Sequence, residues 1–116
     1  MPVTFGAVRK IALALDGVEE ALSYGAPAFK VQGVMIARLR DELGALVVRM
    51  GIDEREALIA EDSETYFVTD HYLKYPYVLV NLARVHPDAL RDLLRAAWRS
   101  ASAEKRGTKK RPSKIK

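Results

Sequence analysis

The pattern of hydrophobic and polar positions predicts helices at both ends of the chain and short strands between them. Near the N-terminus, apolar residues recur with the 3.6-residue period of a helix that Thr4 can cap. Residues 20–50 alternate with a period close to two and are interrupted by glycines, which is typical of an antiparallel meander. Gln32-Gly33 suits one of its hairpin turns.

The second half of the chain predicts a helix, a strand and a final helix. The stretch "DEREALIAED", from Asp53, has acids in its first turn, where they favour the helix dipole, and we expect it to be mostly solvated. Residues 77–82 predict a buried strand. The final helix opens at Pro87 and carries one apolar stripe: Leu90, Leu93, Leu94, Ala97 and Trp98. The pattern as a whole predicts a small α+β domain.

Alternation along the strands predicts a basic face of the sheet. Two strands each direct one set of apolar residues the same way, and we expect that set in the core: Met35, Ala37, Leu39, Leu46, Val48 and Met50. Val34 and Ile36 are then expected on the second face. The same face collects the basic residues of the sheet, which form a candidate nucleic-acid surface: Lys30, Arg38, Arg40 and Arg49.

Charge divides the 116-residue chain into two regions. Residues 1–100 hold 12 Lys and Arg against 14 Asp and Glu, a balance of −2, whereas residues 101–116 hold seven basic residues and one acid, a balance of +6. We therefore expect a domain over residues 1–102 and a disordered basic tail over residues 103–116. Lys109, Lys110 and Arg111 in the tail are further candidates for contact with phosphates.

Several classes of function lose support from what the sequence lacks. It has no cysteine and no run of about 18 apolar residues, so we expect a cytoplasmic protein without disulfides or a membrane partner. His71 and His86 stand apart from other ligand types, so no metal is expected. No phosphate-binding glycine loop occurs, and Asp70-His71 lies in no nucleophile turn. We expect no cofactor and no enzymatic activity.

The stretch "SETYFVTDHYLKYPYVLV", residues 63–80, leaves two interpretations open. It holds four tyrosines, one histidine and one proline ahead of a run of strand formers. Aromatic rings beside basic groups can stack on unpaired bases. The rings can equally pack under a sheet, with Pro76 causing the bend before the strand, and we favour packing.

Four segments of the chain carry a family resemblance. They are "SYGAPAFKV" from Ser23, "ARLR", "YFVTDHYLKYPYVLVNL" and "PDALRDLLRAAW". Over roughly residues 5–100 the chain resembles the MmcQ/YjbR family of small bacterial proteins. The resemblance implies a fold similar to the bacterial frataxin CyaY, a two-layer antiparallel β-sheet with helices packed on one face. Frataxins bind iron through acids of the first helix, where this chain has Arg9 and Lys10, so the resemblance does not extend to iron.

The resemblance also implies a function without catalytic chemistry. The family is often described as DNA-binding through a double-wing arrangement of strands. We therefore expect a non-enzymatic DNA-binding protein that uses the basic sheet face and the tail. The alternative is an adaptor that binds a protein or a small molecule at the surface formed by the family motif: Tyr24, His71, Tyr72 and Tyr75.

Overall fold

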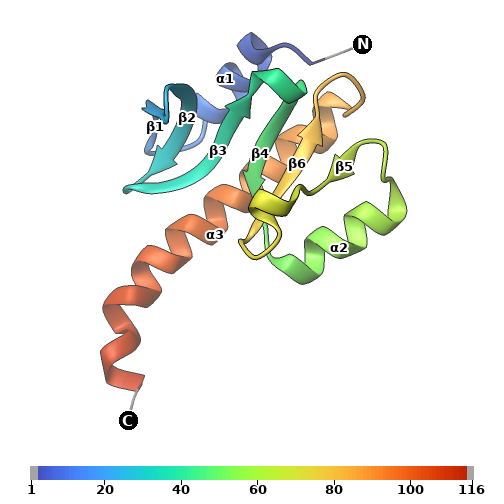
Figure 1. The fold of residues 1–116 in the computed structure, drawn as a ribbon. Helices are drawn as coiled ribbons and strands as arrows, with labels where there is room; N and C mark the ends of the chain where they lie inside the picture. Colours follow the sequence, from blue (N-terminus) through green and yellow to red (C-terminus); the bar gives the residue numbers. More distant parts are fainter. Residues whose placement is uncertain (1–2, 115–116) are drawn as a thin grey trace.

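A six-stranded antiparallel sheet forms the centre of the computed structural model, which describes the backbone of residues 3–114 and the side chains of residues 3–103 (Figure 1). The strand order is β1-β2-β3-β4-β6-β5. This arrangement confirms the α+β fold. The elements are α1 (Phe5–Leu13), β1 (Val18–Ser23), β2 (Ala26–Val31), β3 (Val34–Arg40), η1 (Asp41–Leu43), β4 (Ala45–Arg49), α2 (Ile52–Glu61), β5 (Tyr66–Phe67), η2 (Asp70–Tyr72), β6 (Tyr77–Asn81) and α3 (Pro87–Lys114).

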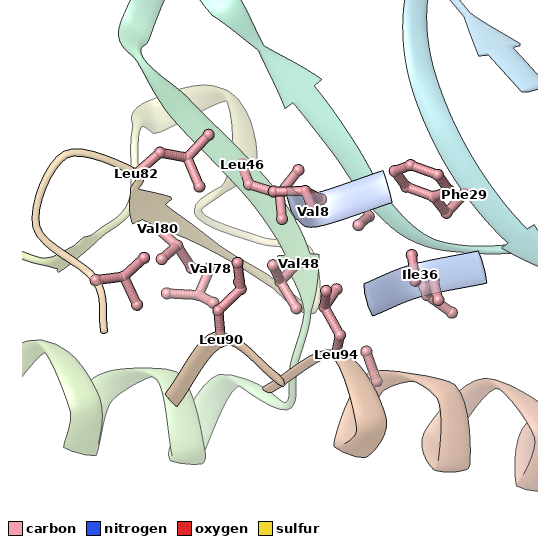
Figure 2. Packing of buried hydrophobic residues seen from close by; sticks show 14 of the residues in the cluster. Val8, Phe29, Ile36, Leu46, Val48, Val78, Val80, Leu82, Leu90 and Leu94 are labelled. Atoms are coloured by element: carbon pink, nitrogen blue, oxygen red, sulfur yellow. The ribbon is translucent and has the colours of Figure 1, made fainter. Parts of the chain in front are cut away.

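The main hydrophobic core lies between one face of the sheet and the helices α1 and α3 (Figure 2). The hydroxyl oxygen of Thr4 accepts a hydrogen bond from the amide of Ala7 at 3.2 Å, which confirms the predicted cap of α1. In α3 the apolar stripe is directed into the core, where Leu90 and Leu94 are fully buried. Trp98 is only partly buried, and its indole nitrogen donates to the carbonyl oxygen of Asp16 at 2.8 Å.

Two tight hairpins join the first three strands. Gln32 and Gly33 both have positive φ, 51° and 83°, as a type I′ turn requires, and they form the predicted turn between β2 and β3. Tyr24 and Gly25 form the corresponding turn between β1 and β2, with φ of 52° and 80°. A tyrosine in this left-handed region is uncommon, because its Cβ crowds the backbone there.

A β-bulge in β3 reverses part of the predicted alternation. Phe29 pairs with Ala37 whereas the next residue, Lys30, pairs with Met35, so Ile36 is an extra residue in β3. The extra residue exchanges the two faces for the start of the strand. Val34 and Ile36 therefore pack in the core, and Met35 lies on the second face beside Lys30. The prediction was wrong for these three residues of β3.

The second face of the sheet is partly covered by the segment between β5 and β6. A smaller hydrophobic cluster forms there from Ala45, Val47, Tyr72 and Leu79, with Phe67, Val68 and Tyr77 packed around it. Tyr72 belongs to the 3-10 turn η2, which lies against the sheet on the side away from α3 (Figure 1). This face is therefore not a uniform basic surface.

Helix α3 continues to Lys114, past residue 102, where the composition predicts the end of the ordered domain. The side chains of residues 104–116 lie outside the described residues, and so do those of Lys109, Lys110 and Arg111. The disorder of residues 103–116 stays a prediction. Among the described helices, none is both long enough and apolar enough to cross a bilayer.

Replacing Leu94 tests the packing of α3 on the sheet. Leu94→Ala should lower the free energy of unfolding by about 2–5 kcal/mol, because it opens a cavity at a fully buried position. Leu13→Ala, at the last residue of α1 with 44% exposure, should change it by less than about 1 kcal/mol. Urea unfolding followed by circular dichroism measures both. Equal losses in the two variants would contradict the packing described here.

Candidate functional site

The side chain of Arg55, in α2, binds backbone carbonyl groups of the turn that leads from η2 into β6. The side chain is only 1% exposed, although it comes from the helix that the sequence predicted to be mostly solvated. Its guanidinium donates to four carbonyl oxygens at 2.9–3.3 Å: those of Tyr72, Leu73, Tyr75 and Tyr77. It also pairs with Glu56 at 3.2 Å. The buried charge is therefore fully hydrogen-bonded, which offsets the cost of removing it from water.

Tyr72 connects this segment to the arginines of β3. Its ring lies in the smaller cluster and contacts the ring of His71 edge-on, with 4.7 Å between the two ring centres. Its phenol oxygen accepts one hydrogen bond from Nη1 of Arg38 at 3.1 Å and one from Nη1 of Arg40 at 3.3 Å. Tyr72 is 6% exposed, so its predicted place on a binding surface is corrected to one beneath it. Its ring is apolar enough to be buried, while its hydroxyl still finds partners.

The two arginines have further contacts that fix their positions. Nε of Arg38 donates to the carbonyl oxygen of Ser23 at 3.0 Å, and its guanidinium lies 5.6 Å from the ring centre of Tyr24. Arg40 makes an ion pair of 2.6 Å with Glu42. The hydrogen bond that Arg40 donates to Glu42 is the main cause that raises the pKa of Arg40, and the one it donates to Tyr72 is the second. The bond with Arg40 also lowers the pKa of Glu42. Both groups are therefore charged at neutral pH.

Arg38, Arg40 and the residues around them line a pocket of about 660 Å³, which we call the arginine pocket. It lies within the size range of small-molecule sites, roughly 300–1,000 Å³. Its walls combine residues from the predicted basic face with residues from the family motif. The lining residues are Tyr24, Arg38, Arg40, Glu42, Leu43, Thr69 and His71. The two surfaces that the sequence suggested separately thus meet in one place.

Besides the buried Tyr72, three predicted site residues with described side chains lie outside this pocket. Arg49 has the alternation of Arg38, but it is the last residue of β4, and its Nε approaches Oγ of Ser100 on α3 at 3.4 Å. A long side chain at the end of a strand can turn around the sheet, so Arg49 does not line the pocket with Arg38 and Arg40, and its contact with nucleic acid stays a prediction. Lys30 pairs with Glu19 and Met35 in the sheet register and does not line the pocket. Tyr75 is 57% exposed and also lies outside it.

No cluster of three or more histidine, cysteine or acidic residues suited to a metal ion occurs in the described part of the chain. His86 has a local structural contact, since its Nδ1 accepts from the amide of Asp88 at 3.0 Å in the first turn of α3. His71 is exposed at the pocket wall. Neither histidine has an arrangement that indicates a metal.

Arg55 is the important residue that sequence reasoning missed. A signal for it existed, because Arg55 is the one lysine or arginine between Met50 and Lys74, in a helix otherwise rich in acids. An isolated arginine among acids is usually explained by surface pairing with its neighbours. Its actual partners are carbonyl groups 17 to 22 residues further along the chain, which periodicity cannot indicate.

Comparison with known proteins gives a family for this fold and pocket. The YjbR family model matches residues 13–100, which include Arg55 and every residue that lines the arginine pocket. The chain belongs to the YjbR family. The YjbR match covers all of the sheet, together with α2 and the first half of α3. No solved structure matches the chain.

Curated relatives of this YjbR chain are found in mycobacteria. Uncharacterized proteins of Mycobacterium bovis and of two Mycobacterium tuberculosis strains are 40% identical to it over 58 residues. The alignment covers 50% of this chain and 43% of each relative, so the chain matches less than half of their length. Their names state no activity.

The contribution of Arg55 can be measured by unfolding. Arg55→Met keeps a long unbranched side chain but removes the guanidinium from four carbonyl groups, of which only those of Tyr72 and Tyr75 keep a backbone donor among the described contacts. Since one buried unsatisfied group costs about 1–3 kcal/mol, we expect a loss of roughly 3 kcal/mol or more in the free energy of unfolding.

Arg91→Met is the matched control for this experiment. Arg91 pairs with Asp88 at 2.9 Å on the exposed side of α3, and loss of such a surface pair should cost roughly 0–1 kcal/mol. If Arg55→Met is no less stable than this control in urea unfolding, the guanidinium does not hold the segment as the contacts indicate.

Proposed function

We propose that this chain is a non-enzymatic binding protein whose arginine pocket takes a ligand with an anionic group. The observation that carries the proposal is the convergence of Arg38 and Arg40 on one oxygen atom, that of the Tyr72 phenol, at 3.1 and 3.3 Å. Two guanidinium groups this close to one point can direct N–H groups at a single phosphate or carboxylate, the geometry in which arginine binds most strongly.

The pocket is pre-organised for such a ligand. Among the described contacts Arg38 uses Nε and Nη1, so both hydrogens of Nη2 are available. Its position is already fixed by the carbonyl of Ser23 and the phenol of Tyr72. A side chain that is ordered before binding loses little entropy on binding, which favours affinity.

Binding without catalysis is the better description because the pocket pairs no nucleophile with a base. Thr69 and His71 both line it, but no hydrogen bond between them occurs among the described residues. The ring of His71 makes an edge contact with Tyr72 instead. Nucleophilic catalysis requires a base within hydrogen-bond reach of the attacking group. The geometry therefore supports recognition of a ligand more than its conversion.

DNA binding is a second candidate, and the charge of residues 101–116 favours it. Their balance of +6 contrasts with −2 for residues 1–100. Two of the four cations predicted to form a basic face lie outside the pocket, and Glu42 neutralises part of the charge of a third. Duplex DNA would therefore be held mainly by the basic tail, through phosphate contacts without sequence preference.

Phosphate binding to Arg38 variants tests the first candidate. Inorganic phosphate, titrated into the full chain, should shift the amide NMR signals of residues around the pocket. Arg38→Gln should weaken this binding about tenfold or more, since a hydrogen bond to a charged group is worth about 1.5–3 kcal/mol. Arg91→Gln on α3 should leave it unchanged. Equal binding by wild type and Arg38→Gln would reject the arginine pocket as the anion site.

Removal of residues 103–116 tests the second candidate. The shortened chain should retain at most a weak, non-specific affinity for duplex DNA, roughly 10⁻⁴ to 10⁻⁶ M, and most of the salt dependence should disappear with the tail. Gel shifts at several salt concentrations measure both quantities. Undiminished affinity after truncation would mean that the domain itself carries duplex binding.

A further inference from the structure

Tyr24 has a conformation and an exposure that folding alone does not explain. It occupies the first central position of the turn between β1 and β2, with φ of 52°, where glycine, asparagine and aspartate are the usual residues. The side chain is 95% exposed, so its ring contributes little to the core. Unfavourable backbone conformations of this kind concentrate at functional sites. The turn therefore holds an aromatic ring in water at the wall of the arginine pocket.

The ring of Tyr24 lies directly beside the cations of the pocket. Its centre is 5.6 Å from the guanidinium carbon of Arg38, and that guanidinium shares the phenol oxygen of Tyr72 with Arg40. The Arg38 contact restrains the ring, yet its high exposure leaves most of its surface accessible. The pocket thus offers a planar aromatic surface next to a site for an anion.

A ligand that uses both features must carry a planar ring close to an anionic group. A nucleotide has this chemistry, with a base that stacks on aromatic side chains and a phosphate that binds arginine. A base inside a duplex is already stacked and paired, and cannot use the ring. The ligand would then be a free mononucleotide or an unpaired nucleotide within a single strand.

We propose that the arginine pocket binds one nucleotide unit, with the phosphate on Arg38 and Arg40 and the base stacked on Tyr24. This inference rests on the proposed function, because it requires the same anion site. Glu42 acts as a competitor for the phosphate, since its carboxylate already occupies Arg40 at 2.6 Å. Binding of the phosphate displaces Glu42 from Arg40, so Glu42 lowers the affinity and favours ligands with the higher negative charge.

The first experiment compares inorganic phosphate, adenosine and adenosine monophosphate on the full chain by isothermal titration calorimetry. The monophosphate should bind at least about tenfold more tightly than inorganic phosphate, because stacking of one base on an aromatic ring raises the affinity by about tenfold or more. Tyr24→Asn should remove this advantage and leave phosphate binding in place. Asparagine is a suitable replacement because it tolerates the positive φ of the turn.

Two variants control for the ring and for exposed tyrosines in general. Tyr24→Phe keeps an aromatic ring and should keep the advantage of the monophosphate. Tyr75→Asn removes another exposed tyrosine, outside the pocket, and should change nothing. Glu42→Gln should tighten binding of both phosphate and monophosphate, and a weakening in that variant would overturn the role given to Glu42.

A second comparison tells whether the nucleotide belongs to a single strand or is a free mononucleotide. A thymidylate decamer that binds more tightly than thymidine monophosphate, and loses this binding in Tyr24→Asn, identifies a single strand as the source of the nucleotide. If Tyr24→Asn weakens the monophosphate but not the decamer, the free mononucleotide is the ligand, and the tail accounts for binding of the strand. Wild type and Tyr24→Asn have the same tail, so the tail cannot cause a difference in binding between them.

The outcomes distinguish this inference from the proposal on which it rests. If phosphate and adenosine monophosphate bind equally and Tyr24→Asn affects neither, the nucleotide inference is overturned and the anion site remains. If phosphate binding is absent or insensitive to Arg38→Gln, the proposed function fails as well.

Discussion

One buried arginine determines the shape of the second face of the sheet. The turn from η2 into β6 has little regular structure, and its backbone supplies few donors of its own: the amide of Tyr75 donates to Tyr72 and the amide of Tyr77 to Tyr75. Arg55 supplies donors to four carbonyl groups from Tyr72 to Tyr77, and the amide of Met50 supplies one to Pro76 at 2.8 Å. Buried backbone polar groups need such partners. The segment can therefore lie against β4 and β6 in one conformation.

The arginine pocket depends on this arrangement through Tyr72. Because the carbonyl of Tyr72 is bound to Arg55, its ring is directed into the smaller cluster and its hydroxyl reaches β3. The hydroxyl then orders Arg38 and Arg40, which would otherwise be long, mobile side chains on an open sheet face. A cation in α2 thus positions two cations in β3, although none of the three contacts another by any bond among the described residues.

The two faces of the sheet therefore have different roles. The face towards α1 and α3 carries the large hydrophobic core and most of the apolar burial. The other face has a small cluster that supports a polar, open pocket. Of the family-motif residues, Tyr72 is buried beneath the pocket, whereas Tyr24 and His71 are exposed at its wall. Rigid support beneath a few exposed groups is what a binding site requires.

The sequence by itself determined the order and type of the main elements, although not the short strand β5 or the two 3-10 turns. The cap at Thr4, the turn at Gln32-Gly33 and the stripe of α3 from Pro87 are encoded by residues only a few positions apart, and all three were predicted correctly. These features depend on local backbone preference and on periodicity, so a single sequence is enough to find them. The residues Arg38 and Arg40 were also identified correctly as neighbours on one face.

Only the tertiary structure decided how these pieces form a site. The bulge at Ile36 is a property of the pairing between two strands, and it moved Val34 and Met35 to the faces opposite to those expected. Arg55 reaches carbonyls at least 17 residues away, and Arg38 reaches a phenol 34 residues away. Arg49 turns to α3, 51 residues away. Alternation gives the direction in which a side chain leaves the backbone, whereas the partner it meets depends on which distant segment folds beside it.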